Sequence, residues 1–497
     1  MHIALINAPL KSTVCDYSIG HQIPLGLLMV GGPLLDAGFQ VTLIDGARDY
    51  LSGAETARRV AEMGADVVMI SHVGSTQAHP CCMHTLRAIK AASPSVVTVY
   101  GGVHPSYHYT DILMKNREVD IIVRGEGEVT ALELLCVLAD AQKGQERREE
   151  LFSSGILASV QGVVWRCNGQ VTANPTRPPI QDLDAWRIGW ELIEDWDRYQ
   201  AFGLGRAAVV QFSRGCPHTC TYCGQWMFWK RWRHRDTIAF VDEVERLHKE
   251  HQVNYFWLAD ENPTTDKAIW KGVLEEIIRR GLDISLSATI RSQDIVRDAD
   301  LMPLYKQAGF IYILLGLETV TDENMDKIRK GSCVNDGYQA VRLLRRHHIM
   351  SVVDYIFGID EETPRTLWRG LRGLLYYDGD VVNVLYLTPH AWTPLGKAMK
   401  DAPIIEPDLW KWDYRHQVIG VPQLTPSQLF LGVKLIEFLY HLHPRRLWAI
   451  LTASDPRMRR QLRFCIWNTL PWFWMEVYEH IADRLTVSRK RAARLLP

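Results

Sequence analysis

Apolar and polar positions follow two alternating patterns over the first third of the chain. Short apolar runs have the composition of buried strands, and the longer segments between them repeat apolar residues at helical spacing. Strands that alternate with helices predict a doubly wound, Rossmann-like parallel sheet, so we expect an α/β domain over residues 1–140. The expected strands are 3–8, 41–45, 67–71, 96–100 and 121–123, and the expected helices are 24–37, 54–63 and 83–92.

The pattern breaks over residues 141–200, which we interpret as a linker. A charged run occupies 143–150 and prolines cluster at 175–179, both typical of a connection between domains. Between them, two apolar runs flank Asn168 and Gly169, a dipeptide that favours a tight turn. The linker is therefore expected to carry a hairpin over residues 156–172.

Strand and helix patterns alternate again over residues 201–390. Six successive strand–helix units predict a partial (β/α)6 barrel, whose active site is expected at the carboxyl ends of its strands. The expected strands are 209–212, 255–259, 284–288, 311–315, 352–357 and 381–386.

The last part of the chain, residues 391–497, is expected to be mainly helical and is rich in Trp and Arg. Aromatic rings beside arginines can clamp a large, flat, anionic ligand. The segment 464–478, followed by basic residues, would also suit a helix anchored at a membrane surface. Aromatic residues in a helical region are also commonly core residues.

Composition narrows the class of protein. The 497 residues carry a net charge of −1, so nothing in the global balance indicates nucleic acid as a partner. The ten cysteines do not form the pattern of a disulfide framework, which favours a reducing cytoplasm. Residues 1–9 lack the features of a signal peptide, and no 18-residue uncharged apolar stretch occurs. A cytoplasmic protein, at most peripherally membrane-associated, is expected.

Three cysteines, Cys216, Cys220 and Cys223, lie within eight positions. Three thiolates this close can ligate three irons of a [4Fe-4S] cluster and leave the fourth iron open to a small molecule. A zinc loop is the alternative, because zinc takes four Cys or His ligands and His218 lies inside the loop.

This C-x3-C-x2-C spacing is the signature of the radical S-adenosylmethionine (SAM) family, and the chain resembles that family well beyond the cysteines. The resemblance implies that the open iron chelates SAM, that an electron donor such as flavodoxin or ferredoxin supplies one electron, and that SAM is cleaved to methionine and a 5'-deoxyadenosyl radical. No catalytic residue beyond the cluster is assigned. The residues that the resemblance places at SAM are Tyr222 near adenine, Asp260 or Glu261 at the amine, Ser287 and Arg291 at the carboxylate or ribose, and Gly316 and Glu318 at the end of the fourth barrel strand.

The three acidic positions in this set have a simpler alternative. The residues around Asp260 and Glu261 precede Pro263 and could form a helix N-cap cluster, and Glu318 could cap the following helix.

The N-terminal domain resembles the cobalamin-binding domain that precedes many radical SAM domains, through its P-L-G-L run at 24–27 and its R-G-E-G-E run at 124–128. No G-x-G-x-x-G follows the first strand, which argues against a dinucleotide. The D-x-H-x-x-G motif of an axial His is absent, and among His72, His79 and His104 the spacing singles out none; a degenerate domain without cofactor is the alternative. Strand ends line ligand sites in such sheets, and the candidate cobalamin contacts are Ser71, His72, Gly74, Ser75, Gly101, Gly102, His104, Gly125 and Glu126.

The sequence that follows the last cysteine is more specific than the cysteines. Segments 225–229, 233–236, 241–243 and 258–264 resemble the anaerobic magnesium-protoporphyrin IX monomethyl ester oxidative cyclase family. The resemblance implies an oxidoreductase that uses cobalamin and a [4Fe-4S] cluster to form the isocyclic ring of bacteriochlorophyll, with water as the oxygen source and a tetrapyrrole substrate. One alternative is a cobalamin-dependent radical SAM C-methyltransferase acting on a tetrapyrrole, hopanoid or other natural product. Another is a noncatalytic corrin- or tetrapyrrole-binding protein with a structural cluster.

Overall fold

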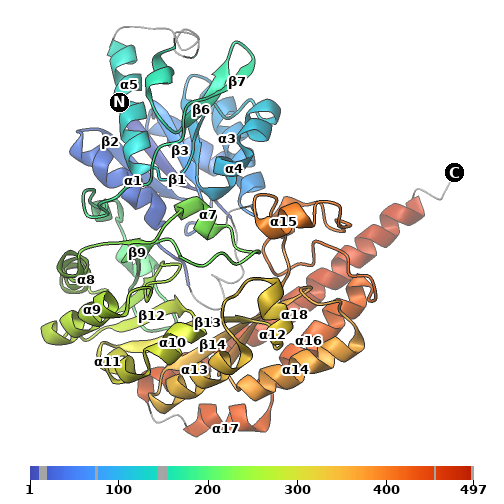
Figure 1. Ribbon diagram of the computed structural model, residues 1–497. Coiled ribbons are helices and arrows are strands. Elements are labelled where there is room, and N and C mark those ends of the chain that lie inside the picture. Colours follow the sequence, from blue (N-terminus) through green and yellow to red (C-terminus); the bar gives the residue numbers. More distant parts are fainter. Residues whose placement is uncertain (11–19, 73–75, 144–151, 153–154, 453–454, 494–497) are drawn as a thin grey trace.

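The computed structural model describes the chain except for residues 11–19, 73–75, 144–151, 153–154, 453–454 and 494–497 (Figure 1). Two sheets, each covered by helices, stack one above the other, with a helical region beside the second. The predicted α/β class, with a doubly wound sheet followed by a partial barrel and a helical C-terminal region, is confirmed.

The first sheet has the strand order β2-β1-β3-β4-β5-β6-β7. Its first five strands are parallel, and the order reverses between β1 and β3, the position where ligands bind in doubly wound sheets. The linker hairpin, β6 and β7, adds to this sheet through an antiparallel pairing with β5. The strands are β1 (His2–Asn7), β2 (Gln40–Asp45), β3 (Val67–Ser71), β4 (Val97–Gly101), β5 (Ile121–Val123), β6 (Val163–Cys167) and β7 (Gln170–Ala173); the helices are α1 (Leu25–Asp36), α2 (Gly53–Glu62), α3 (His79–Ala92), α4 (Val103–Lys115) and α5 (Glu128–Lys143).

The second sheet contains six parallel strands whose spatial order follows the sequence, as a partial barrel requires. A short antiparallel pair, β9 with β10, lies between its first two strands in the sequence. The strands are β8 (Ala207–Val210), β9 (Ser213–Arg214), β10 (Arg233–His234), β11 (Tyr255–Leu258), β12 (Ser285–Ile290), β13 (Phe310–Glu318), β14 (Met350–Phe357) and β15 (Val381–Tyr386). The helices are α7 (Gln225–Trp229), α8 (Thr237–His251), α9 (Lys267–Arg280), α10 (Ser292–Arg297), α11 (Met302–Gln307), α12 (Asp322–Lys327), α13 (Val334–Arg346) and α14 (Pro364–Tyr377).

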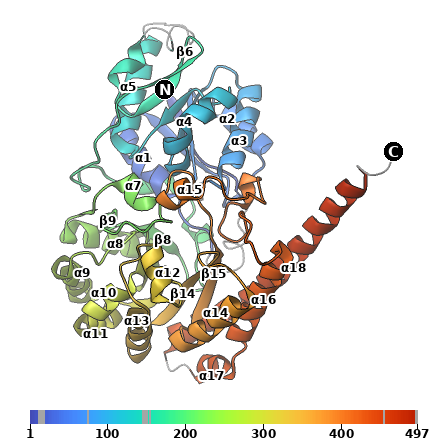
Figure 2. The same ribbon diagram turned by 45° about the vertical axis from the view of Figure 1, so that its right-hand side comes forward.

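The C-terminal helices pack beside the barrel, with α16 against α14. The C-terminal end of the last helix, α18, projects away from the rest of the molecule (Figure 2). Within the described part of the chain, no helix is both long and apolar enough to cross a bilayer. The helices are α15 (Pro394–Ala398), α16 (Pro426–His441), α17 (Pro444–Thr452) and α18 (Pro456–Ala493).

Candidate active site

One cavity of about 650 Å³ lies between the two sheets and is lined by the strand ends of both. The first sheet contributes the ends of β1, β3, β4 and β5, and the barrel contributes the ends of β8, β11, β12 and β13. The three cysteines and most of the predicted cofactor contacts line this cavity. The fold therefore brings together residues that are more than 200 positions apart in the sequence.

The cysteine loop is fixed by contacts from several elements. Gly215 has φ of 91°, a left-handed conformation that favours glycine, and it packs against the backbone of Arg231. The Thr221 N–H donates to the carbonyl of Ile328 at 2.9 Å. Gly224 packs directly against the indole of Trp392, which leaves no room for a side chain there. Contacts within the protein alone thus define the shape of the loop.

The cysteines fit a cluster better than a single ion. All three line the cavity as free thiols, and no three His, Cys, Asp or Glu side chains of the described residues converge on one ion. A zinc ion needs its ligands about 2 Å from one point, whereas each cysteine of a [4Fe-4S] cluster takes a different iron. The predicted fourth zinc ligand, His218, instead lies 3.3 Å from the side-chain amide of Gln293. Burial raises the pKa of the Cys216 thiol, and raises that of Cys223 to about 12.

Asp260 and Glu261 both face the cavity, and both hold backbone around the cysteine loop. Asp260 accepts hydrogen bonds from the backbone N–H of Phe212 and Ser213, at 3.1 and 2.5 Å. Glu261 accepts from the Gly215 N–H at 3.3 Å and from the Trp229 indole at 2.7 Å. Burial raises the pKa of each carboxyl to about 7. Their present contacts therefore orient the loop that carries the cysteines.

Tyr222 and Glu318 meet at the end of β13 with Lys330. The Tyr222 hydroxyl donates to Glu318 Oε1 at 2.8 Å, and the Lys330 ammonium donates to the same oxygen at 2.8 Å. Glu318 has φ of 65° at an irregularity of the β13–β14 pairing, which turns its carboxylate into the cavity; Thr321, not Glu318, caps α12. Gly316 makes room for this pair, since a Cβ there would lie 2.5 Å from Glu318 Oε1.

Arg291 and Ser287 have different surroundings. Arg291 lines the cavity, with Nη1 3.7 Å from the Cys220 sulfur, and a second guanidinium nitrogen donates to the carbonyl of Lys330. Its buried Nε has no partner among the described residues, so it can serve an anionic group in the cavity. Ser287 is fully buried and bonded to the Tyr255 hydroxyl at 2.5 Å, and it is not among the residues that line the cavity.

The wall of the cavity formed by the first sheet contains glycines that leave open space. Gly26 and Gly125 have open space where a Cβ would lie, so the backbone can approach a large ligand closely. Of the predicted cobalamin contacts, those that line the cavity are Ser71, His72, Gly101, Gly102, Gly125 and Glu126. Gly74 and Ser75 lie outside the described residues.

Of the three histidines considered for an axial position, His72 alone lines the cavity, and burial lowers its pKa to about 4. His104 lies away from the cavity, between His79 and His108, with its ring tilted against both and ring centroids 4.5 and 4.6 Å apart. Thr76 hydrogen-bonds both His104 and His390, at 3.2 Å each, and so joins α4 to the segment after β15. His104 therefore belongs to an interdomain imidazole cluster.

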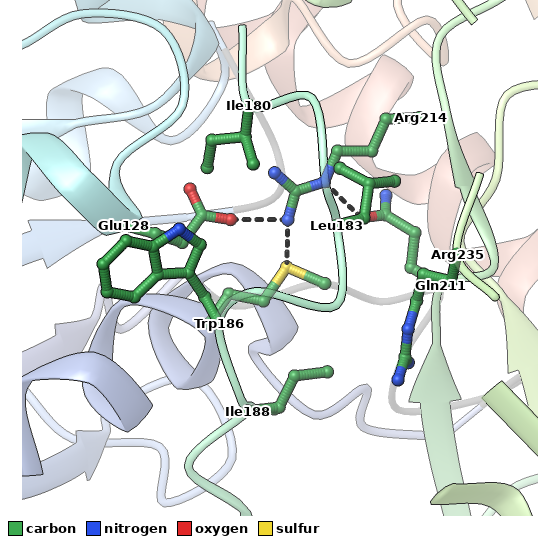
Figure 3. A pocket seen from close by; sticks show the side chains of 9 residues that line it. Glu128, Ile180, Leu183, Trp186, Ile188, Gln211, Arg214 and Arg235 are labelled. Carbon is green, nitrogen blue, oxygen red and sulfur yellow. Dashed lines mark hydrogen bonds and ion pairs between the residues drawn. The ribbon is translucent and has the colours of Figure 1, made fainter. Parts of the chain in front are cut away.

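Buried ion pairs join the two domains beside the cavity, and Figure 3 shows the one between Arg214 and Glu128. The guanidinium of Arg214, two residues before the first cysteine, donates to Glu128 at 2.5 Å, to Gln211 and to the sulfur of Met29. Arg233 donates to Glu126 at 2.6 Å. The R-G-E-G-E run of the first domain is thereby bound to the loop that carries the cysteines.

Sequence patterns did not reveal several of these residues. Lys330, Asp354, Arg214 and Gln211 line the cavity but belong to no recognisable spacing. Asp354 accepts from the Asn383 amide at 2.7 Å, and burial, with Glu318 nearby, raises its pKa to about 7. Of these four residues, only Asp354 could have been noticed in the sequence, because it is the one charged residue of a mostly apolar strand.

Some aromatic residues of the C-terminal part lie close to the cysteine loop, and others are exposed. His390 and Trp392 stack 4.7 Å apart beside the cysteine loop. Trp410, Trp448, Trp467 and Trp474 are exposed and do not line the cavity.

Two family models match the chain. Residues 13–135 match the B12 binding domain, and residues 210–372 match the radical SAM superfamily. These matches coincide with the first sheet and with the barrel, so the cofactors expected at the cavity are cobalamin, SAM and a [4Fe-4S] cluster. The donor sets described above fit them.

Individual proteins are similar over greater lengths. The anaerobic magnesium-protoporphyrin IX monomethyl ester cyclase of Synechocystis is 41% identical over 95% of this chain and 91% of its own. The enzyme of that name from Rubrivivax gelatinosus is 31% identical over 78% of this chain and 71% of its own. Among solved structures, the radical SAM methyltransferase TsrM from Kitasatospora setae, with cobalamin and a [4Fe-4S] cluster bound, superposes with a TM-score of 0.66 at 16% identity and covers 89% of each chain.

Proposed function

The chain belongs to the family of anaerobic magnesium-protoporphyrin IX monomethyl ester cyclases, and from that premise we propose that it closes the isocyclic ring of this tetrapyrrole without oxygen, as a step of bacteriochlorophyll formation. The observation that carries the proposal is the single cavity onto which the cysteine loop and the strand ends of both sheets open. Cofactors held by the two domains would there face one substrate.

When bound, SAM and the cluster supply a carbon-centred radical that can remove hydrogen from an unactivated C–H bond, which polar side chains cannot do. The residues of this chain position the reactants and keep water and other quenchers out. Cys216, Cys220 and Cys223 would hold the cluster.

We assign the SAM contacts to the charged wall of the cavity. Carboxylates suit the SAM amine and ribose hydroxyls, and a guanidinium suits its carboxylate. Arg291, with its unpartnered Nε, is the candidate for the carboxylate, Glu318 for the ribose and Tyr222 for the adenine side. Asp260 and Glu261 remain the candidates for the amine, alongside their contacts to the cysteine loop. Ser287 would act only indirectly, through Tyr255.

We assign cobalamin to the wall of the first sheet. Ser71, His72, Gly101, Gly102, Gly125 and Glu126 line the cavity there, and Gly74 and Ser75 follow His72 in the sequence. His104 would contribute through the packing of α4 and not through contact.

The alternative is a C-methyltransferase that uses the same cofactors. Its support is the likeness to TsrM, whose 16% identity is evidence for the fold alone. The cyclase assignment is favoured because the Synechocystis cyclase matches 95% of the chain at 41% identity.

The mass of the product separates the two activities. Anaerobically reconstituted protein, incubated with SAM, cobalamin, a reductant and magnesium-protoporphyrin IX monomethyl ester, should yield the oxidised, ring-closed product. A product heavier by one methylene, with S-adenosylhomocysteine formed alongside, would contradict the cyclase assignment and support methyl transfer.

The function also requires an electron donor and access to an apolar substrate. We propose that a flavodoxin- or ferredoxin-type protein of the cytoplasm supplies the electron, and that the cyclase chain itself contacts a membrane surface peripherally.

The membrane contact is proposed for an apolar stripe at the surface of α16. Leu431, Leu435, Phe438 and Leu442 are exposed, and Trp448 follows on α17. A stripe of this kind can rest on lipid. L435E/F438E should reduce co-sedimentation with phosphatidylglycerol vesicles, whereas E361Q should not.

A further inference from the structure

A surface groove of about 740 Å³ is lined by one face of α14, by Val334 at the start of α13 and by Val320. Both helices lie on the outside of the barrel (Figures 1 and 2). Arg365, Trp368, Arg372 and Tyr376 follow one another on the same face of α14 at helical spacing. All four are exposed, the two aromatic rings by more than half. The groove thus presents two cations and two flat rings to solvent.

The two arginines are free to meet a partner. Arg369, on the same helix, is paired with Asp360, but neither Arg365 nor Arg372 makes an ion pair or hydrogen bond with any residue the structure describes. Surface cations without internal partners attract an acidic protein and accelerate its association. The ring of Tyr376 is held by stacking on Tyr338, 4.5 Å between centroids, so that wall of the groove is ordered.

The segments that form the floor of the groove are continuous in sequence with residues that contact the cysteine loop. Val320 forms part of the floor, fitted against Gly373 of α14. Two residues earlier, Glu318 accepts the hydroxyl of Tyr222, between Cys220 and Cys223. On the other side, Val334 lines the groove and follows the 328–331 segment, whose Ile328 carbonyl accepts the Thr221 N–H. Both segments under the groove therefore touch the cysteine loop directly.

We infer that this groove is the docking site of a flavodoxin-type electron carrier, an inference that rests on the proposed function. The carrier's acidic surface would pair with Arg365 and Arg372, and the edge of its flavin would approach Trp368 and Tyr376. One electron passes from the reduced flavin to the cluster; the carrier is oxidised by one electron, the cluster is reduced by one, and no bond is made or broken. The concave, cationic groove suits a protruding acidic protein, whereas the convex apolar stripe of α16 suits a lipid surface.

The test compares binding and reduction in a charge-reversal variant. Reconstituted full-length protein and R365E/R372E are titrated with a chemically reduced flavodoxin at low ionic strength. The variant should raise the Kd and lower the rate of cluster reduction at least tenfold, and the salt dependence of both should flatten. SAM cleavage driven by dithionite, which needs no docking, should be unchanged. R460E/R463E, with the same charge change on α18, is the matched control and should behave as the parent.

Several results would overturn the inference. These are an unchanged flavodoxin Kd in R365E/R372E, an equal loss of activity with dithionite, or cluster reduction by a ferredoxin but not by the flavodoxin. Loss of binding to anionic vesicles, or of a concentration-dependent dimer, with flavodoxin binding intact would assign the groove to lipid or to a second copy. Failure of ring closure in the parent, with docking intact, would instead contradict only the cyclase assignment.

Discussion

The barrel side of the cavity carries buried carboxylates and cations that bond to one another, whereas the side formed by the first sheet presents glycines and aliphatic side chains. On the barrel side, Glu318, Lys330 and Tyr222 share one hydrogen-bond network. On the other side, Met69, Val99 and Val123 line the wall, with Gly101 at its edge. The difference agrees with the ligands that we propose for the two walls: a zwitterion such as SAM needs paired charges, while a corrin needs space and close backbone approach. The first sheet's own acids at the cavity, Glu126 and Glu128, are already neutralised by barrel arginines.

The largest effect is expected where the charged wall meets the metal. Cys220→Ala should abolish ring closure and SAM cleavage, because a cluster with two protein thiolates is poorly held. Iron content after anaerobic reconstitution should fall from near four per chain toward zero. Cys136→Ala, at an exposed cysteine of the first domain, should keep its iron. Full iron in C220A would contradict the assignment of the loop.

The next largest effect is expected from removing the buried ion pair between the two domains. Arg214→Gln leaves Glu128 buried without its cation, a change that typically costs about 3–5 kcal/mol. Urea unfolding should show the loss of stability, and the fraction of cobalamin retained on gel filtration should fall with it. Arg58→Gln, which removes exposed helix-surface pairs, should leave both unchanged. Equal behaviour of the two variants would show that the interdomain pair is dispensable.

The imidazole cluster of His79, His104, His108 and His390 is the second contact between the domains, and it should make the free energy of unfolding depend on pH. Burial lowers the pKa of His390 and His79 to about 4, so these rings stay neutral in the folded protein while the unfolded chain takes up protons below about 6.5. Stability should therefore be full above pH 6.5 and fall as pH decreases toward 4, by up to about 3 kcal/mol per ring.

Urea titrations at pH 7 and pH 5 measure this loss. His390→Gln should be less stable at pH 7 but lose less between the two pH values, and exposed His234→Gln should match the parent. An identical slope for H390Q would assign the acid sensitivity to other groups.

A smaller effect is expected from filling the charged wall. Gly316→Ala places a methyl 2.5 Å from Glu318 Oε1 and 2.8 Å from Lys330 Nζ, so the pair must move at a cost of about 1–3 kcal/mol. SAM affinity, measured by calorimetry on reconstituted protein, should fall about tenfold. Gly272→Ala, a helix position with open space around it, should cause no loss. Unchanged SAM binding in G316A would place SAM elsewhere.

The smallest effect on stability is expected from a substitution in the wall formed by the first sheet. Gly101→Ala meets nothing closer than the Val123 carbonyl at 4.0 Å, so thermal unfolding should be unchanged. The added methyl nevertheless enters the cavity, and we expect cobalamin affinity to fall at least tenfold in a titration followed by absorbance. The two glycine variants thus separate the walls: G316A should affect SAM binding, and G101A cobalamin binding.

The sequence predicted the strands and helices well, because their hydrophobic periods are local. The expected strands at 67–71 and 381–386 coincide with β3 and β15. The cysteines and the strand-end glycines were also found, since motif and strand end coincide there. Side-chain pairings across the fold were not predicted. Arg214 and Glu128 are 86 positions apart, and neither the cysteine spacing nor the R-G-E-G-E run indicates that they pair. Lys330 reaches the cavity from a loop whose path depends on the packing of α12 and α13.

The contact between Gly224 and Trp392 has a consequence for how the protein matures. Gly224 directly follows the third cysteine, whereas Trp392 lies beyond the last barrel strand. While the chain emerges from the ribosome, the cysteine loop is complete long before the tryptophan that packs against it has been made. The loop therefore lacks that contact while residues 225–391 are made, an interval in which iron and sulfide can reach the cysteines before the indole packs against the loop.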